Sequence, residues 1–372
     1  MKILVAPLNW GLGHASRCIP LIQRLLNEGN EVILGGDGES LTLLRKHFPQ
    51  LRYVYLAPLN LRYSKGTRQV WAMLKALPQL FFWALKDHAL LQALLREEPF
   101  DQVISDNRFG LYMSNRRSRS DSASGLTSNS ETVYISHQLH IMLPKGWKWA
   151  ESIASRLHAR IYTRFNKVWV PDYENPDQSL AGELSHPTQI SNFKFLIPRE
   201  RLFQISNLEY IGPLSRFTNY QLPMTINKWD VVAVLSGLEP HRTLLEQDII
   251  ARYSNSPKDG LTAKRSDSET TQQQSGHEVL IVQGLMNRPN TRLKRGNITL
   301  VPYLNDDELA SALLGAQHII ARSGYSTIMD LEALGLLNHK SEIINHKLEL
   351  IPTPGQPEQE YLAFLTQKRI SM

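Results

Sequence analysis

The amino-acid sequence predicts an α/β protein made of two doubly wound parallel sheets that face each other across a cleft. Three observations indicate this fold class. Short apolar runs alternate with segments of helical periodicity, which is typical of parallel strands joined by crossover helices. This alternation occurs twice, in two halves of similar length. The chain has 372 residues, more than one simple core usually holds.

The first half opens with a strand, a glycine turn, a helix and a second strand. Residues 2–8 read KILVAPL, a continuous apolar strand, and residues 14–29 carry apolar side chains at helical spacing. Gly29 suits the end of this helix because glycine accepts a left-handed backbone. The strand EVILGG follows at 31–36, so the unit is a right-handed βαβ crossover.

The rest of the chain repeats this order. In the first half we expect a helix at 67–97 and further strands at 52–57, 100–106, 132–138, 167–172 and 208–217. In the second half we expect strands at 229–237, 277–284, 297–304 and 317–324, and helices at 306–316 and 326–335. A Gly-Pro break places the boundary between an N-terminal Rossmann-like domain, 1–213, and a C-terminal one, 214–372.

Two segments fit neither series of elements. Residues 114–131 and 253–276 are rich in polar and charged side chains and show no apolar periodicity. They cannot bury enough apolar surface to offset the entropy of chain ordering, so we predict two low-complexity loops.

Composition limits the cellular setting and the kind of ligand. Cys18 is the single cysteine, which excludes a disulfide framework and favours a reducing, cytoplasmic compartment. The N-terminus lacks the apolar region of a signal peptide, and we find no apolar run long enough to span a membrane. The net charge of +6 suits an anionic ligand or surface, but the basic run at 115–120 lacks the interleaved aromatic residues of a nucleic-acid site.

The turn LNWGLGHASR, residues 8–17, carries the first candidate site. Gly11 and Gly13 permit a tight turn and let the backbone approach a ligand closely. His14 then stands at a helix N-terminus, where free N–H groups favour negative charge and keep the imidazole neutral, ready to accept a proton. A plain turn with a capping histidine would have the same sequence.

The stretch ARSGYSTIMDLEALG, residues 321–335, carries the second candidate site. A strand ends at a turn of small residues, and a helix follows. Backbone N–H groups and hydroxyl groups at the start of this helix would hold a diphosphate; the residues concerned are Ser323, Gly324, Tyr325, Ser326 and Thr327. Asp330 would accept hydrogen bonds from a ribose diol, with Glu332 as the competing acid. The simpler interpretation is that the small residues only cap the helix and that the acidic residue is exposed to solvent.

The stretch IPTPGQPEQEYLA, residues 351–363, carries the third candidate site. Its prolines and glycine predict a rigid loop, after which Gln359 and Glu360 open a helix. An amide beside a carboxylate supplies hydrogen-bond donors and acceptors together, which suits the hydroxyl groups of a sugar.

With these motifs the sequence resembles the GT-B glycosyltransferases, and most of all the MurG-type UDP-N-acetylglucosamine transferases and their uncharacterised bacterial relatives. The resemblance covers the first 40 residues and residues 229–363. It implies that the GLGH turn opens an acceptor-side domain and that Asp330 holds the donor ribose. It further implies sugar contacts from Gln359 and Glu360, a uracil contact from the backbone of Leu304, and a second phosphate turn at Ser236–Gly237.

The activity that this resemblance implies is an inverting, metal-independent transfer of a sugar from a UDP-sugar to an acceptor hydroxyl. The acceptor would be a lipid-linked or cell-envelope glycan at the inner face of the membrane. The UDP-sugar is a substrate, so we expect no cofactor. The sequence contains no Asp-x-Asp triplet and no Cys/His cluster with metal-ligand spacing, which argues against a metal-dependent site.

Four residues after strands or turns are the candidates for the acceptor side of this reaction. We expect His14 to be the general base, with Asp106, just past the end of a strand, in reserve. His137 and Gln138 follow the next strand and would face the acceptor, although a structural role is equally open for both.

Other interpretations remain open at this point. Gly11, Gly13 and Asp37 fit a nicotinamide-dependent oxidoreductase, although Ser16 replaces the third glycine of the dinucleotide fingerprint. The chain ends soon after the helix that begins at Gln359 and Glu360, so a protein that binds a sugar nucleotide without catalysis is a third class. Basic, aromatic helices at 67–97 and 146–165 would lie on an anionic bilayer or, more plainly, be buried crossover helices.

Overall fold

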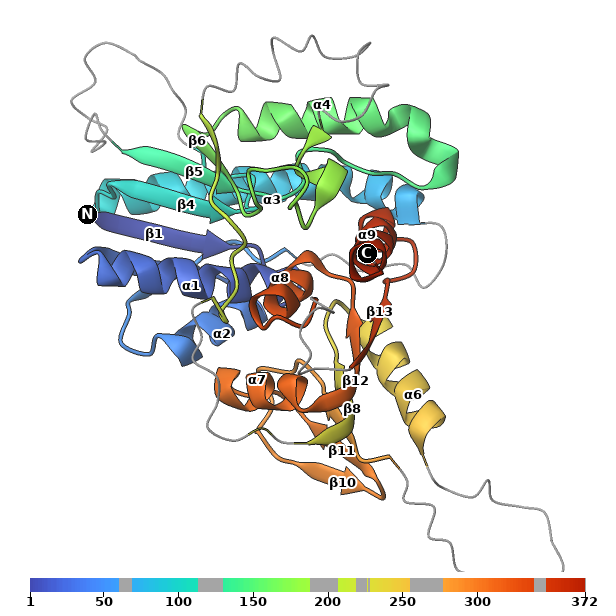
Figure 1. Cartoon of the computed structure of the whole chain (residues 1–372). Coiled ribbons are helices and arrows are strands. Elements are labelled where there is room, and N and C mark those ends of the chain that lie inside the picture. The colour runs from blue at the N-terminus through green and yellow to red at the C-terminus, as the bar shows by residue number, and fades with distance from the viewer. Residues whose placement is uncertain are drawn as a thin grey trace, which may run out of the picture.

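The chain folds into two α/β bodies, each built around its own sheet (Figure 1). The computed structural model describes residues 1–59, 69–112, 130–187, 207–218, 226, 228–254, 277–337 and 346–371. The predicted fold class is therefore confirmed. Apart from two residues at an end of each, the polar segments 114–131 and 253–276 lie outside the described residues.

The first body contains a sheet whose strands are all parallel. In spatial order it reads β3-β2-β1-β4-β5-β6-β7. The strands are β1 Lys2–Pro7, β2 Glu31–Gly36, β3 Tyr53–Tyr55, β4 Gln102–Asp106, β5 Glu131–Ile135, β6 Lys167–Val170 and β7 Leu208–Tyr210. The helices are α1 Gly13–Asn27, α2 Gly38–His47, α3 Gln69–Glu97 and α4 Glu151–Tyr162, with short 3₁₀ helices η1 Lys145–Ala150 and η2 Gly182–Leu184.

The second body contains a smaller sheet, in the order β10-β11-β9-β8-β12-β13. Its strands are β8 Trp229–Val234, β9 Val279–Val282, β10 Leu293–Arg295, β11 Ile298–Val301, β12 Ala316–Arg322 and β13 Lys347–Ile351. Only β10 runs antiparallel, against β11. The helices are α6 His241–Tyr253, α7 Asp306–Leu314, α8 Tyr325–Ala333 and α9 Pro357–Ile370.

Helices cover both faces of the first sheet, which explains its continuous apolar strands. In β1, Ile3 and Val5 pack on one face with the residues of α1, whereas Leu4 and Ala6 pack on the other face with α3. Successive strand residues point to opposite faces, so a strand that is buried on both sides must be apolar at every position.

Each strand predicted from an apolar run is present, and the unpredicted elements lie mostly at the surface or at sheet edges. The side chains of β10 are all exposed, so the sequence there has neither an apolar run nor an alternation. Edge strand β13 and helices α2 and α6 were likewise not predicted. These three elements contain many polar residues, so their sequences show no clear apolar periodicity.

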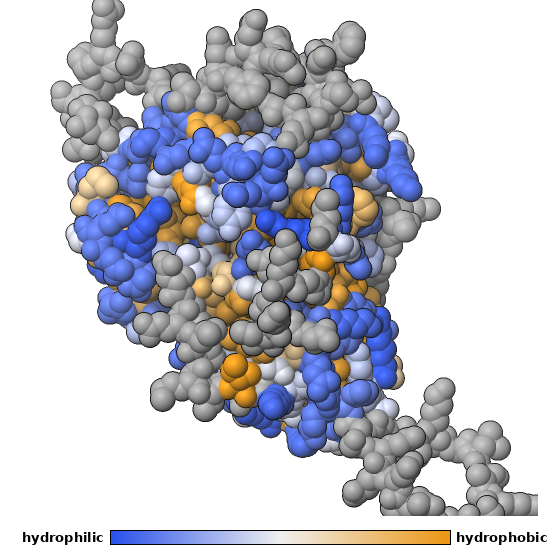
Figure 2. Space-filling model, viewed as in Figure 1, coloured by the Kyte–Doolittle hydropathy of each residue, from blue (hydrophilic) through white to orange (hydrophobic). Residues whose placement is uncertain are grey.

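The two bodies touch along several elements. Helix α1 lies beside α8, as Figure 1 shows at the junction of the bodies. Helix α9 of the second body packs against the segment after β6, where Tyr361 Oη accepts a hydrogen bond from Glu183 N at 2.9 Å. Lys46 Nζ also donates to Met286 O at 2.7 Å. On the face shown in Figure 2, hydrophobic residues are visible where the two bodies meet, between largely hydrophilic outer surfaces.

The boundary at 213/214 stays a prediction, but the sheets agree with its position. The last strand of the first sheet is β7 and the first strand of the second sheet is β8. Leu180 and Leu184, earlier in the chain, share a core cluster with the second body. Among the described residues, no helix has the length and hydrophobicity needed to cross a membrane.

The stability of the first body should fall as the pH is lowered, because His158 of α4 is buried among aromatic rings. Burial lowers the pKa of His158 to about 4. The unfolded chain takes up a proton below about pH 6.5, whereas the folded chain resists protonation until about pH 4. Stability is therefore complete above the unfolded pKa and is lost as the pH falls through this window.

Urea unfolding at pH 7 and pH 4.5 measures this loss. In the His158→Phe variant the difference in unfolding free energy between the two pH values should shrink by on the order of 2 kcal/mol. The exposed His277 provides the control, since His277→Phe should leave the difference unchanged. An equal pH dependence in wild type and His158→Phe would contradict the assignment.

Candidate functional site

Each sheet has a switch point, where neighbouring strands send the chain to opposite faces. In the first sheet it lies between β1 and β4, and in the second between β8 and β12. Ligands of doubly wound sheets bind at the carboxyl ends of the strands beside such a point. All three glycine turns predicted to bind a ligand lie there, at 8–17, 236–237 and 323–324.

The switch points of the two sheets lie against each other. A Cβ atom on Gly11 would lie 3.8 Å from the Cα atom of Gly237, and a Cβ atom on Gly13 would collide with Ser326 Oγ. Gly11 and Gly237 also have positive φ angles, +80° and +93°, which side chains with a Cβ atom rarely adopt. Gly13 is thus needed for the close approach of the two bodies, whereas Gly11 and Gly237 are needed for their left-handed backbone conformations.

The N-termini of α1 and α8 meet at this junction without their usual partners. The N-cap residues Leu12 and Gly324 provide no side-chain hydrogen bond, and neither helix has an acidic residue in its first turn. Helix α7 is the contrast: Asn305 and Glu308 form a reciprocal capping box there. Free N–H groups and two positive helix ends therefore converge, which favours an anion between them.

His14, on the first turn of α1, lies against the carboxylate at the end of β4. His14 Nδ1 is 2.9 Å from Asp106 Oδ1, and Arg17 Nε donates to Asp106 Oδ2 at 2.5 Å. Arg17 Nη2 reaches Oδ1 as well. Asp106 is fully buried and Arg17 almost so, whereas the side chain of His14 keeps 18% of its exposure. The two candidates for the base therefore form one hydrogen-bonded pair, backed by a buried arginine.

Asp106 is ionised in this setting. Burial alone would raise its pKa, but the charges and hydrogen bonds of Arg17 and His14 outweigh burial and bring the pKa well below its usual value. For Arg17, burial acts to lower the pKa and Asp106 more than offsets it. His14 Nδ1 lies between this carboxylate and Arg17 Nη2, which is 3.0 Å away. In the tautomer that carries a proton on Nδ1, the permanent carboxylate accepts the hydrogen bond from Nδ1–H and Nε2 keeps a lone pair.

His137 connects this pair to the second body. Arg17 Nη1 is 3.2 Å from His137 Nδ1, and His137 Nε2 is 2.8 Å from Glu358 Oε1 on α9. Gln138 Nε2 donates to the other oxygen of Glu358. Because arginine can only donate, Nδ1 of His137 accepts and its Nε2 carries the proton. Burial lowers the pKa of His137, in keeping with this neutral form.

Tyr325 completes the contact between the bodies. Its ring stacks on His137 with centroids 4.2 Å apart, and its hydroxyl donates to Pro171 O at 2.7 Å. The side chain of Tyr325 is buried between the bodies, so only its backbone N–H remains available at the start of α8.

Asn107 sets the direction of the chain after Asp106. It is the non-glycine residue with positive φ, 58°, among those described. Asparagine tolerates this left-handed conformation better than most residues, and Tyr134 Oη donates to its side chain at 2.7 Å. Leu8 N donates to Asp106 O at 2.9 Å, which ties the end of β4 to the residue that opens the GLGH turn.

The predicted sugar-contacting residues lie at the start of α9, close to the turn after β12. Ser323 Oγ donates to Gln359 O at 2.8 Å, so the two segments are in contact. The amide of Gln359 accepts from Thr353 N at 2.8 Å and donates to Gln356. Glu360 is exposed on α9. Gln359 therefore supports its own loop, and Glu360 faces solvent.

Asp330 and Leu304 lie deeper than the resemblance implied. Asp330 Oδ1 accepts from Ser215 Oγ at 2.6 Å, and Asp330 Oδ2 lies 3.3 Å from Arg216 Nε. Burial raises the pKa of Asp330. A ribose diol would have to replace the Ser215 contact to reach this carboxylate. The side chain of Leu304 packs in the core, while Thr327 lies near Gly324 at the start of α8.

Asp37, the acidic residue that a nicotinamide-dependent enzyme would use, is hydrogen-bonded to other side chains of the protein. Asp37 Oδ1 accepts from the buried Arg108 at 2.8 Å, and Asp37 Oδ2 accepts from Asn9 at 3.1 Å. Arg108 also pairs with Asp87. This network fixes the turn that begins at Asn9, and it disfavours a ribose contact by Asp37.

Two residues of the site were not predicted from sequence: Arg17 and Glu358. Arg17 follows His14 by three residues, so one helical turn places both on the same face, and a charge within the buried stretch of α1 was the available signal. Glu358 meets His137 across 221 positions of the chain, and no local pattern reports such a contact.

Comparisons with known proteins give distant likenesses. No protein-family model matches the chain, and no curated protein is significantly similar to it. The structure is similar to SsfS6, a glycosyltransferase of Streptomyces sp. SF2575, with 12% identity and a TM-score of 0.48 over 99% of this chain and 86% of that chain.

Two further solved structures give comparable values. The spinosyn rhamnosyltransferase SpnG complexed with thymidine diphosphate has 13% identity and a TM-score of 0.48, over 100% of this chain and 92% of that chain. Phytolacca americana UGT2 complexed with UDP-2fluoro-glucose and pterostilbene has 12% identity and a TM-score of 0.47, over 99% and 83%. Likenesses this distant carry no activity over to the chain.

The ion pair of Asp106 and Arg17 should be essential for stability. In Asp106→Asn the buried guanidinium loses its counter-charge, so unfolding free energy should fall by about 3–5 kcal/mol. The exposed Asp101 is the control, and Asp101→Asn should cost less than about 1 kcal/mol. Urea denaturation measures both.

A double variant separates charge from packing. Asp106→Leu combined with Arg17→Met removes both charges and should recover most of the loss, because buried pairs are often replaceable by apolar side chains. Wild-type stability in Asp106→Asn would show that the pair is not needed.

Proposed function

We propose that the chain is a glycosyltransferase that moves a sugar from a UDP-sugar to an acceptor hydroxyl. The observation that carries this proposal is the meeting of two uncapped helix N-termini beside the His14–Asp106 pair. The two helix N-termini would bind the diphosphate of the donor. The His14–Asp106 pair would accept the proton of the attacking hydroxyl.

The acceptor hydroxyl attacks the anomeric carbon of the donor sugar. His14 Nε2 takes the hydroxyl proton, while Asp106 stays ionised, accepts the hydrogen bond from Nδ1–H and stabilises the imidazolium that forms. The new bond joins the acceptor oxygen to the anomeric carbon, and the bond from that carbon to the diphosphate oxygen breaks. Attack from the face opposite the leaving group inverts the anomeric centre.

The leaving UDP carries the negative charge that develops in the transition state. The N–H groups at the start of α8, near Gly324, and the turn at Ser236–Gly237 would stabilise this charge. The N-terminus of α1 approaches from the other body. These fixed dipoles take the part that a metal ion plays in metal-dependent transferases, so the reaction requires neither a metal nor a cofactor besides the donor.

The same geometry supports catalysis over silent binding of a nucleotide sugar. Binding alone would require the helix ends but not a histidine whose second nitrogen is held by a buried carboxylate. The partly exposed position of His14, backed by Asp106 and Arg17, is that of a base with access to a ligand.

An acceptor linked to a lipid or to the cell envelope, as in MurG-type enzymes, would bring the protein to a membrane surface. Helix α4 and the preceding η1 carry a matching exposed face. Trp149, Ile153 and Leu157 are exposed at intervals of four residues, Trp149 by 70%. Exposed bases flank them, namely Lys145, Lys148, Arg156 and Arg160. An apolar stripe with flanking cations suits the surface of an anionic bilayer.

Release of UDP from UDP-glucose and UDP-N-acetylglucosamine, with water as the acceptor, tests the reaction. The His14→Gln variant should lower this rate by about 100-fold or more, while the UDP dissociation constant from calorimetry stays within threefold. His277→Gln is the control and should match wild type. The rate should also survive an excess of EDTA.

Each outcome has a defined meaning. A wild-type rate in His14→Gln would exclude it as the base, and loss of activity with EDTA would exclude the metal-independent route. UDP binding without any release of UDP from either donor, or from a wider donor panel, would favour the silent binding protein.

Flotation with vesicles containing anionic phospholipid tests membrane contact. A triple variant, Trp149→Ser, Ile153→Ser and Leu157→Ser, should reduce the bound fraction at least fivefold. Leu244 and Leu293 of the second body are about as exposed, so their serine variants control for general loss of surface hydrophobicity. Equal binding by the triple variant and the controls would overturn a membrane role of α4.

A further inference from the structure

A cavity of about 250 Å³ opens between the two bodies beside the GLGH turn. The first body contributes Asn9, Trp10 and Gly11 after β1, Glu39 of α2, and Leu59 after β3. The second body contributes the turn Gly237–Leu238 after β8. The cavity therefore lies over the carboxyl ends of the central strands of both sheets, where ligands of such sheets bind.

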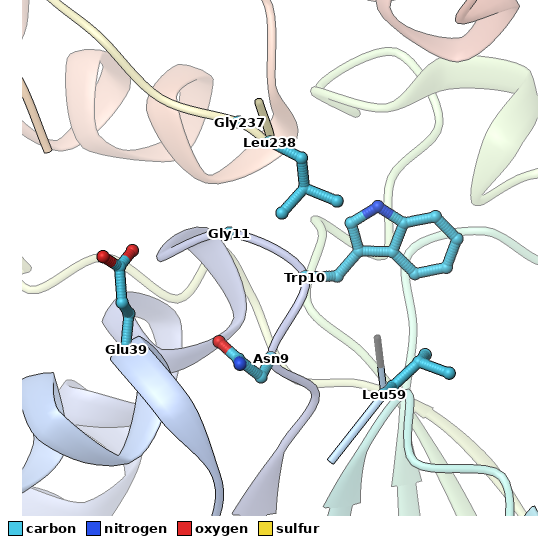
Figure 3. Close-up of a pocket in the computed structure, with 7 residues that line it drawn as sticks. All are labelled: Asn9, Trp10, Gly11, Glu39, Leu59, Gly237 and Leu238. Atoms are coloured by element: carbon cyan, nitrogen blue, oxygen red, sulfur yellow. The ribbon is translucent and has the colours of Figure 1, made fainter. Parts of the chain in front are cut away.

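The lining is divided into an apolar side and a polar side. Figure 3 shows the indole of Trp10 between the side chains of Leu59 and Leu238, with the carboxylate of Glu39 and the amide of Asn9 on the opposite side. A ligand that fits must combine an apolar face with groups that donate hydrogen bonds.

Glu39 is the polar group that remains available to such a ligand. Among the described residues, no hydrogen bond or ion pair joins its carboxylate to a neighbour; Arg242 and Glu239 act on it only electrostatically. Burial, aided by Glu239, raises its pKa. Asn9, in contrast, uses its amide nitrogen on Asp37 and its oxygen on the backbone N–H of Ser40.

The size of the cavity limits the ligand to a single ring. Pockets that enclose drug-sized molecules measure about 300–1,000 Å³, so this cavity is smaller than that class. Gly11, which lines it, belongs to the turn that leads into α1 three residues before His14. A ring held here would therefore lie beside the turn that carries the proposed base, and the bulk of a larger acceptor would extend outward.

We infer that this cavity binds one monosaccharide ring of the acceptor. The C–H face of the sugar stacks on the indole of Trp10, and two hydroxyl groups donate to the carboxylate of Glu39. Sugars present an apolar face and a rim of donors, which matches the divided lining, whereas a purely apolar ring would leave the Glu39 carboxylate unpaired and buried. This inference rests on the proposed transferase function and adds the place where one ring of the acceptor binds and the residues that hold it.

Ligand-observed saturation-transfer NMR tests the cavity directly. The probes are the methyl β-glycosides of glucose, galactose and N-acetylglucosamine, with cyclohexylmethanol as an apolar ring of similar size. At least one glycoside should bind the wild-type protein in the presence of saturating UDP, with its ring protons receiving the transfer, and cyclohexylmethanol should bind at least tenfold more weakly.

Variants assign the signal to this cavity. Trp10→Ala and Glu39→Leu should each weaken glycoside binding at least tenfold, and Glu39→Gln less, because its amide oxygen still accepts a hydrogen bond. Trp10 is partly buried against a small core cluster, so Trp10→Phe is added to keep the packing and should give an intermediate loss. The exposed Glu278 is the matched control, and Glu278→Gln should bind like wild type.

The inference is overturned if no glycoside binds, if the variants bind as wild type does, or if cyclohexylmethanol binds as well as the sugars. UDP calorimetry on the same proteins separates this result from the donor site. UDP binding without glycoside binding removes the acceptor inference alone. Glycoside binding in a protein that does not bind UDP removes the transferase proposal and leaves a sugar site.

Discussion

The buried ion pair between Arg17 and Asp106 is the interaction on which the rest of the site depends. Asp106 ends its strand without exposed surface, and an isolated carboxylate there would cost several kcal/mol. Arg17 supplies the counter-charge from α1 and so fixes the first turns of that helix against the carboxyl end of β4. His14 and His137 both take their orientation from these two side chains. His14, the proposed base, and the contact with the second body therefore share one electrostatic origin.

The second constraint is the meeting of two helix ends of the same polarity. The N-termini of α1 and α8 repel each other weakly, and side-chain contacts between the bodies keep them together, such as Glu358 on His137 and Tyr325 on Pro171. An anion bound between the helix ends removes this repulsion. If a diphosphate binds there as proposed, its binding and the closure of the two bodies are thermodynamically linked, since each makes the other more favourable.

The fold was predictable from sequence because strands buried on both faces must be apolar, as residues 3–7 of β1 and all of β9 are. The glycine turns were predictable because Gly11 and Gly237 occupy conformations that few other residues adopt. The roles of individual side chains were harder to predict. Asp106 was considered a substitute for His14, whereas the structure pairs them, and Asp330 meets Ser215 rather than an open pocket. Such contacts join residues about 90 to 220 positions apart, so no local periodicity encodes them.

The left-handed backbone of Asn107 has a consequence for sequence drift in this protein. The residue does not line the cavity, yet it directs the chain out of β4 while the carbonyl of Asp106 stays bonded to Leu8. Glycine and aspartate can adopt the same torsion angles at little cost, whereas valine or isoleucine would force the peptide to rotate and would shift the carboxylate behind it. Position 107 should therefore accept few substitutions over evolutionary time, because of its backbone geometry and the hydrogen bond that its side chain accepts from Tyr134.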